Sequence, residues 1–138
     1  MTRRFELHEH TADVAIEGRG VTMDDAFEAV AEGLAAAMCD RWPEEGESGA
    51  VTVVSESPEA LLFDYLDELI YQRDVHNVLP VEHSVSIERT GDEWTLSGSY
   101  RGIPLDRIDA REIKAVTYSE MVLEPIEEGW RAYVVVDV

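Results

Sequence analysis

The hydrophobic positions predict two helices in the first half of the chain. Between residues 23 and 38, apolar side chains recur every three or four positions, which is the spacing of one helix face. Thr22 is a candidate N-cap for this helix, with Asp25 three residues on. A second stripe follows Ser57 as cap and Pro58 at the first helical position. The two predicted core faces consist of Met23, Phe27, Val30, Leu34 and Met38, and of Leu62, Leu66, Leu69 and Ile70.

The remaining hydrophobic positions alternate with a period of two residues, which is typical of β-strands. The expected strands cover residues 5–7, 14–17, 51–54, 81–87, 94–100, 113–123 and 130–137, with hairpin turns at 90–92 and 127–129. Strands before, between and after two helices predict an α+β fold. We expect one compact domain over residues 1–138, with a largely antiparallel or mixed β-sheet and two main helices packed on it.

The chain carries a large excess of negative charge. It has 30 acidic and 11 basic side chains, a net charge of −19 over 138 residues. This charge opposes contact with phosphate backbones, so direct nucleic-acid binding is not expected. Lys114 is the single lysine, and every other basic residue is arginine. Acid excess with almost no lysine is typical of proteins adapted to molar salt, where charges are screened over about 3 Å, and we expect a halophilic source.

Sequence features also bear on location. The longest apolar stretches, such as residues 33–38, are far shorter than the roughly 18 residues that a membrane span requires. The first residues contain no apolar run of the kind that a secretory signal carries. Cys39 is the only cysteine, which fits a reducing compartment, and we expect it to be a small buried side chain. A cytoplasmic protein without membrane contact is therefore expected.

Common catalytic signatures are missing, including the GxSxG and HExxH motifs and glycine-rich phosphate loops. Two segments carry more chemistry: residues 10–13 (His-Thr-Ala-Asp) and residues 114–118 (Lys-Ala-Val-Thr-Tyr). Retention of Lys114 in an arginine-rich composition favours a site that needs a compact point charge. A leftover lysine on a strand face is the alternative.

The end of the sequence brings two carboxylates together. Asp137 is followed directly by Val138 with its terminal carboxylate. Two fixed anions repel each other unless a cation is bound or one is protonated. A third carboxylate, for example Asp13, would complete an all-oxygen site suited to Ca²⁺ or Mg²⁺. From spacing alone, a simple solvated chain end is the alternative.

These segments resemble the archease family. The resemblance depends on residues 9–13 with Gly18 after them, on residues 114–118, and on Asp137-Val138 behind a valine strand. It extends from about residue 8 to residue 138. It implies a protein cofactor rather than an enzyme: proteins of this family assist the tRNA-splicing RNA ligase, which joins a 2′,3′-cyclic phosphate or 3′-phosphate to a 5′-hydroxyl. They promote guanylylation of the ligase and its multiple turnover.

The resemblance also implies roles for individual residues. Asp13 and Asp137 match the family's metal-binding acids, and the Val138 carboxylate matches a further ligand. The implied cofactor is a divalent ion, Ca²⁺ or Mg²⁺, with Mn²⁺ as a further option. His10 and Thr11 are expected to orient Asp13.

Lys114 matches the family lysine that is expected to act on the ligase together with the metal. The following stretch departs from the family pattern at Ser119, where many members have histidine. No role of that histidine is transferred to this chain.

Two other functions remain open from the residues themselves. A small divalent-metal hydrolase would use the same carboxylates to hold a metal that activates water, with Lys114 stabilising an oxyanion. A chaperone-like binding module would contact its clients through an apolar surface. The hydrolase requires turnover without a partner, and the binding module requires indifference to Asp13→Ala.

The charge predicts salt-dependent stability. Self-repulsion of the −19 charge should lower the melting temperature in dilute buffer, and added KCl should raise it by screening. Thermal unfolding followed by circular dichroism across a KCl series tests this. A melting temperature that does not change from low to molar KCl would contradict it.

Overall fold

The computed structural model describes residues 4–9 and 13–138. In chain order the elements are β1 (Arg4–Glu9), β2 (Asp13–Gly20), α1 (Met23–Met38), β3 (Glu47–Ser55), α2 (Pro58–His76), β4 (Val78–Thr90), β5 (Glu93–Pro104), a 3-10 turn η1 (Leu105–Arg107), β6 (Ala115–Ile126) and β7 (Gly129–Asp137). The predicted helices and hairpins are all present, with boundaries shifted by a few residues.

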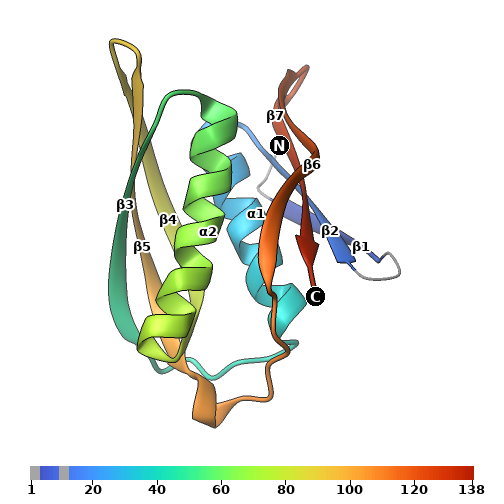
Figure 1. The fold of residues 1–138 in the computed structure, drawn as a ribbon, viewed down its shortest axis with the longest axis vertical. Helices are drawn as coiled ribbons and strands as arrows, with labels where there is room; N and C mark the ends of the chain where they lie inside the picture. Colours follow the sequence, from blue (N-terminus) through green and yellow to red (C-terminus); the bar gives the residue numbers. More distant parts are fainter. Residues whose placement is uncertain (1–3, 10–12) are drawn as a thin grey trace.

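The strands form two antiparallel sheets. One has the order β1-β2-β7-β6 and the other β3-β5-β4. Figure 1 shows the two helices between them: α1 contacts β2 and β4, and α2 contacts β3 and β6. The expected α+β class is confirmed. The division into two sheets is new, because a period of two residues identifies strands but not their neighbours.

Local chemistry explains where the helices begin and end. Thr22 and Asp25 form the predicted capping box, with reciprocal main-chain to side-chain hydrogen bonds of 3.1 and 3.3 Å. Ser57 accepts a 3.1 Å hydrogen bond from the main-chain N–H of Ala60 and begins α2. The last helical turn passes into Asn77, which adopts the left-handed conformation at φ 55°. In the described residues, no helix combines the length and apolar character that crossing a membrane would require.

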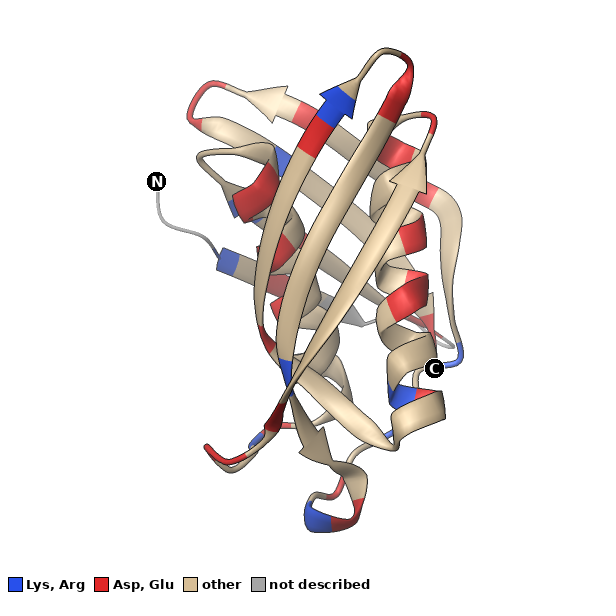
Figure 2. Ribbon diagram, turned by 90° about the vertical axis from the view of Figure 1, so that its left-hand side faces the viewer, with Lys and Arg blue, Asp and Glu red and all other residues tan. Residues whose placement is uncertain are grey.

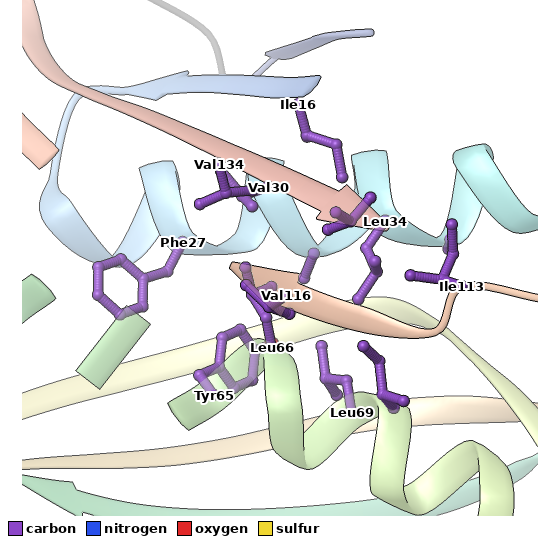
Figure 3. Close-up of a cluster of buried hydrophobic side chains, with 14 of the residues drawn as sticks. Ile16, Phe27, Val30, Leu34, Tyr65, Leu66, Leu69, Ile113, Val116 and Val134 are labelled. Atoms are coloured by element: carbon purple, nitrogen blue, oxygen red, sulfur yellow. The ribbon is translucent and has the colours of Figure 1, made fainter. Parts of the chain in front are cut away.

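The core lies between the two sheets, around the helices, and one part of it is where the helices meet the first sheet. In Figure 3, side chains from β2, β6 and β7 point toward those of α1 and α2; the labelled ones are Ile16, Phe27, Val30, Leu34, Tyr65, Leu66, Leu69, Ile113, Val116 and Val134. Close packing requires glycine at several points; on β2, for example, a Cβ on Gly18 would lie 2.7 Å from a methyl carbon of Val30. Cys39 is buried as predicted, and its thiol donates to the carbonyl of Arg41 over 2.9 Å.

Two acidic side chains connect α1 to the second sheet. The buried carboxylate of Glu28 accepts the main-chain N–H of Val85 over 2.7 Å, and that of Asp24 accepts from Ile87 over 3.4 Å. β4 lies at the edge of its sheet, so these N–H groups face no neighbouring strand. Burial raises the pKa of Asp24, while the bond from Ile87 opposes that rise. Helix α1, which packs on β2 of the first sheet, is therefore fixed to the second sheet by its own acidic side chains.

Candidate functional site

The pairing of β2 with β7 places two aspartates opposite each other. Asp13 begins β2, Asp137 ends β7, and the two are direct partners in the antiparallel register. Side chains at directly opposite positions lie on one face with Cβ atoms about 5 Å apart. On its other side Asp137 pairs with Ala115 of β6. The main-chain N–H of Lys114, just before Ala115, donates to the carbonyl of Asp137 over 2.8 Å. Residues far apart in sequence thus meet at one end of this sheet.

Among the described residues, the two aspartates lack compensating charge. Atom Oδ1 of Asp13 is buried and has no hydrogen-bond partner in the part of the chain that the structure describes. Within residues 4–9 and 13–138, neither Asp13 nor Asp137 forms an ion pair. A buried carboxylate oxygen without a donor is costly unless a cation or a bound group satisfies it.

Further along the same face of β2, charge is balanced. Glu17 pairs with Arg19 over 3.0 Å and with Arg131 over 2.9 Å, and Arg131 also reaches Glu124 over 3.0 Å. Partial burial acts to lower the pKa of Arg131, but the bonds to Glu17 and Glu124 outweigh it and raise that pKa. The contrast with Asp13, four residues away on this strand, singles out the end of the sheet as the uncompensated region.

Two arginines hold the segment that leads into Lys114, Arg73 from α2 and Arg111 from within the segment itself. The buried guanidinium of Arg73, in the last turn of α2, donates to the carbonyl of Ile113 over 3.0 Å. Arg111 donates to two carbonyls at the end of α1, those of Ala37 and Met38. The sequence did not single out Arg73, because nothing in the pattern of α2 distinguishes a buried arginine from a solvated one.

Lys114 itself is exposed and has no ion-pair partner among the described residues. Its ammonium is therefore accessible to a group outside the chain, while its main chain is held by Asp137 and by the anchored segment before it. This combination of a fixed backbone and a solvated charge is suited to recognising an anion.

The remaining predicted residues fall into two groups. Val138 is partly buried, and its side chain packs against the core. His10 and Thr11 lie outside the described residues. The hydroxyl oxygen of Thr117 is buried on β6 without a hydrogen-bond partner in the described structure, so each of the two segments that the sequence singled out contains one unsatisfied polar atom.

The donor set fits a hard divalent cation. Within the described residues, no three His, Cys, Asp or Glu side chains gather as metal ligands, so side chains supply the two carboxylates of Asp13 and Asp137. Carboxylate pairs without nitrogen or sulfur suit Ca²⁺ or Mg²⁺, which complete their coordination with water and carbonyl or carboxylate oxygens. The unsatisfied Oδ1 of Asp13 is the observation that supports this fit.

Comparison with known proteins identifies relatives of this chain. The model of the Archease protein family matches residues 5–138. The chain is 39% identical to protein archease of Thermococcus gammatolerans, over 98% of this chain and 99% of that one. It is 35% identical to protein archease of Pyrococcus furiosus, over 99% of both chains. The chain belongs to the archease family.

Solved structures agree with this assignment. The solution structure of protein 1598 from Methanobacterium thermoautotrophicum has a TM-score of 0.84 and 30% identity, covering 97% of this chain and 98% of that one. A crystal structure from Thermotoga maritima, described as an archease and possible chaperone, has a TM-score of 0.65 and 25% identity, covering 96% of both.

The opposed aspartates should lower the stability of the fold when no metal is present and raise it when a divalent ion binds them. In EDTA, Asp13→Asn should stabilise the fold by about 0.2–1 kcal/mol, because like charges directly opposite on a sheet destabilise it by that amount. Added Ca²⁺ or Mg²⁺ should raise the melting temperature of the wild type and not that of the variant. Asp92→Asn, in the exposed turn after β4, is the charge-matched control and should respond to metal like the wild type. An unchanged metal response in Asp13→Asn would exclude Asp13 as a ligand.

Proposed function

We propose that this protein is a cofactor of the tRNA-splicing RNA ligase that joins 3′-phosphate and 5′-hydroxyl ends. It would promote ligase guanylylation and multiple turnover. Membership in the archease family supports this function. The observation that carries it is the end of the first sheet, where Asp13 and Asp137 oppose each other and the main chain of the exposed Lys114 is hydrogen-bonded to Asp137. Because tRNA splicing by this ligase would occur in the cytoplasm, we propose the same location for this protein.

The chain's own residues would act by positioning charge. Asp13, Asp137 and the terminal carboxylate of Val138 would hold a divalent ion, which when bound supplies positive charge for a phosphate oxygen or an acidic side chain of the ligase. Lys114 would bind a neighbouring anionic group on the same partner. A partner that binds more tightly in its nucleotidyl-transfer conformation is shifted toward that conformation.

This proposal assigns bond making to the ligase and none to this chain. Lys114 and the aspartates would bind and orient groups of the ligase and would form no bond to the RNA. The hydrolase alternative shares the metal ligands but needs turnover without a partner.

A chaperone-like function is the second candidate. The Thermotoga maritima relative is described as a possible chaperone, and this chain exposes several large apolar side chains, including Tyr71, Val75 and Tyr118. Binding of unfolded clients would use such surface and would not depend on Asp13. The two functions are therefore separable by mutation of the acidic pair.

RNA joining by the ligase of the same organism tests the proposal. With GTP, divalent metal and high KCl, the wild type should convert a single-turnover ligase to multiple turnover. Asp13→Ala should remove most of that effect, and Lys114→Arg should reduce it because the planar fork of arginine does not reproduce a compact ammonium. Asp92→Asn serves as control. Absence of stimulation by the wild type would overturn the proposed function, and phosphoester turnover by this chain alone would favour the hydrolase.

The role of Val138 has its own test. Adding a short Gly-Ser extension after Val138 converts the terminal carboxylate to a neutral amide and removes one charge from the site. Metal affinity, measured by calorimetry, should fall by roughly tenfold or more because the affinity of Ca²⁺ sites follows the number of charged ligands. The same extension at the N-terminus is the control. Equal affinity in both extended proteins would remove Val138 from the site.

A further inference from the structure

An aromatic pair is held at the surface between β6 and α2. The rings of Tyr118 on β6 and Phe63 on α2 stack with centroids 4.1 Å apart and an angle of 4° between their planes. Tyr118 remains 56% exposed. The stacking fixes the orientation of a large side chain that solvent still reaches, so little side-chain entropy remains to be lost when something else binds it.

The path of β6 creates this arrangement. Thr117 pairs with Val135 of β7, and the next paired residue is Val122, opposite Tyr133. Residues 118–121 therefore stand against a single residue of β7, and Glu120 among them has a φ of 60°. An irregularity of this kind re-aims side chains at the edge of a sheet. Here it presents Tyr118 toward α2.

Exposed apolar side chains continue from this pair along α2. Tyr71 and Val75 follow Phe63 at steps of eight and four residues. Residues four apart are neighbours on a helix surface, and this row winds gradually around α2 because each step of four turns about 40° beyond a full turn. Tyr71 and Val75 are 56% and 49% exposed. We call Phe63, Tyr71, Val75 and Tyr118 the aromatic ridge. Single exposed apolar residues are ordinary, but a row of them beside a fixed aromatic pair is typical of interaction surfaces.

Acidic side chains border the ridge. Asp67 lies between Phe63 and Tyr71 in the same row, and Glu59 and Asp64 also lie on α2. Asp64 accepts a hydrogen bond from the neutral hydroxyl of Ser55 over 2.6 Å. Asp74, by contrast, is paired with Arg73. Figure 2 shows acidic positions repeated along α2, at the right of that view. A surface with apolar anchors and a negative border matches a partner whose apolar groove is bordered by arginine and lysine. The same border repels nucleic acid.

The ridge is continuous with the candidate site. Tyr118 follows Lys114 by four residues, about 13 Å along an extended strand. Helix α2 packs against β6 (Figure 1), and its Arg73 anchors the segment that enters β6. A protein seated on the ridge would therefore also reach Lys114 and the acidic pair.

We infer that the aromatic ridge is the docking surface for the partner protein, which offers an apolar groove bordered by arginine and lysine side chains. The inference rests on the proposed function, since the partner is the ligase of that function. It separates two tasks on neighbouring surfaces: the ridge supplies affinity, and the metal and Lys114 supply the effect on the bound ligase.

Binding and stimulation measured on the same full-length chain test this inference. Calorimetry gives the dissociation constant for the ligase, and RNA joining gives the concentration for half-maximal stimulation. Tyr71→Ser and Tyr118→Ser should each raise both values about tenfold or more, as expected for aromatic anchors. Tyr118→Phe keeps the ring stacked on Phe63 and should bind like the wild type. Val54→Ser, at a position of β3 that is 53% exposed, is the matched control.

A charge variant tests the nature of the partner surface. Asp67→Asn should weaken binding and reduce its dependence on salt, whereas Asp92→Asn should do neither. Asp13→Asn should lower maximal stimulation.

Each outcome separates the inference from the proposed function. If the wild type stimulates the ligase and both serine variants bind it normally, the ridge is not the docking surface, and the proposed function is unaffected. A wild-type chain that neither binds nor stimulates the ligase overturns both. Circular dichroism confirms that each variant is folded, and weakened binding in folded Val54→Ser equal to that in Tyr71→Ser would also overturn the ridge as the specific docking surface.

Discussion

The antiparallel pairing of β2 with β7 is the constraint on which the rest of the site depends. It joins residues 13–20 to residues 130–137 and sets Asp13 against Asp137. Because side chains alternate across a strand, a slip of one residue would turn Asp13 into the core and Val14 out of it. Burial of the valines on the other face therefore fixes the position of the acids. The hydrophobic core sets the geometry of the polar site.

Charge is distributed unevenly on this framework. Glu28 meets a main-chain N–H group, and Glu17 meets two guanidinium groups. Asp13 meets neither in the described structure, and Asp137 opposes it with the same sign. In a chain with a net charge of −19 this local imbalance persists only because core packing holds the strands together. Repulsion between the two carboxylates lowers the stability of the folded protein without metal. Because a bound cation relieves that repulsion, the same arrangement raises the affinity for the cation.

Much of this could be predicted from local pattern. Thr22 and Ser57 identified the helix starts because capping depends on residues within one turn. The strands followed from alternation. The division of the strands into two sheets could not be predicted. Paired strands such as β2 and β7 are more than a hundred residues apart, and periodicity carries no information on which strands are neighbours. The buried bond from Arg73 to Ile113 likewise depends on tertiary packing alone.

The same distinction applies to the site. Lys114 could be singled out by composition, since it is the single lysine, whereas the exposed stack of Tyr118 on Phe63 could not. A tyrosine in a strand motif is usually part of the packing, and only the irregular path of β6 turns this one outward. The motif that contains Lys114 thus carries two chemistries on one strand, a charge at its start and an aromatic anchor four residues later. Because aromatic burial is not screened by salt and charge contacts are, the two parts would respond differently to ionic strength. In concentrated salt, the proposed partner would therefore be held mainly by the aromatic part, while the charged end would contribute selectivity at contact distance.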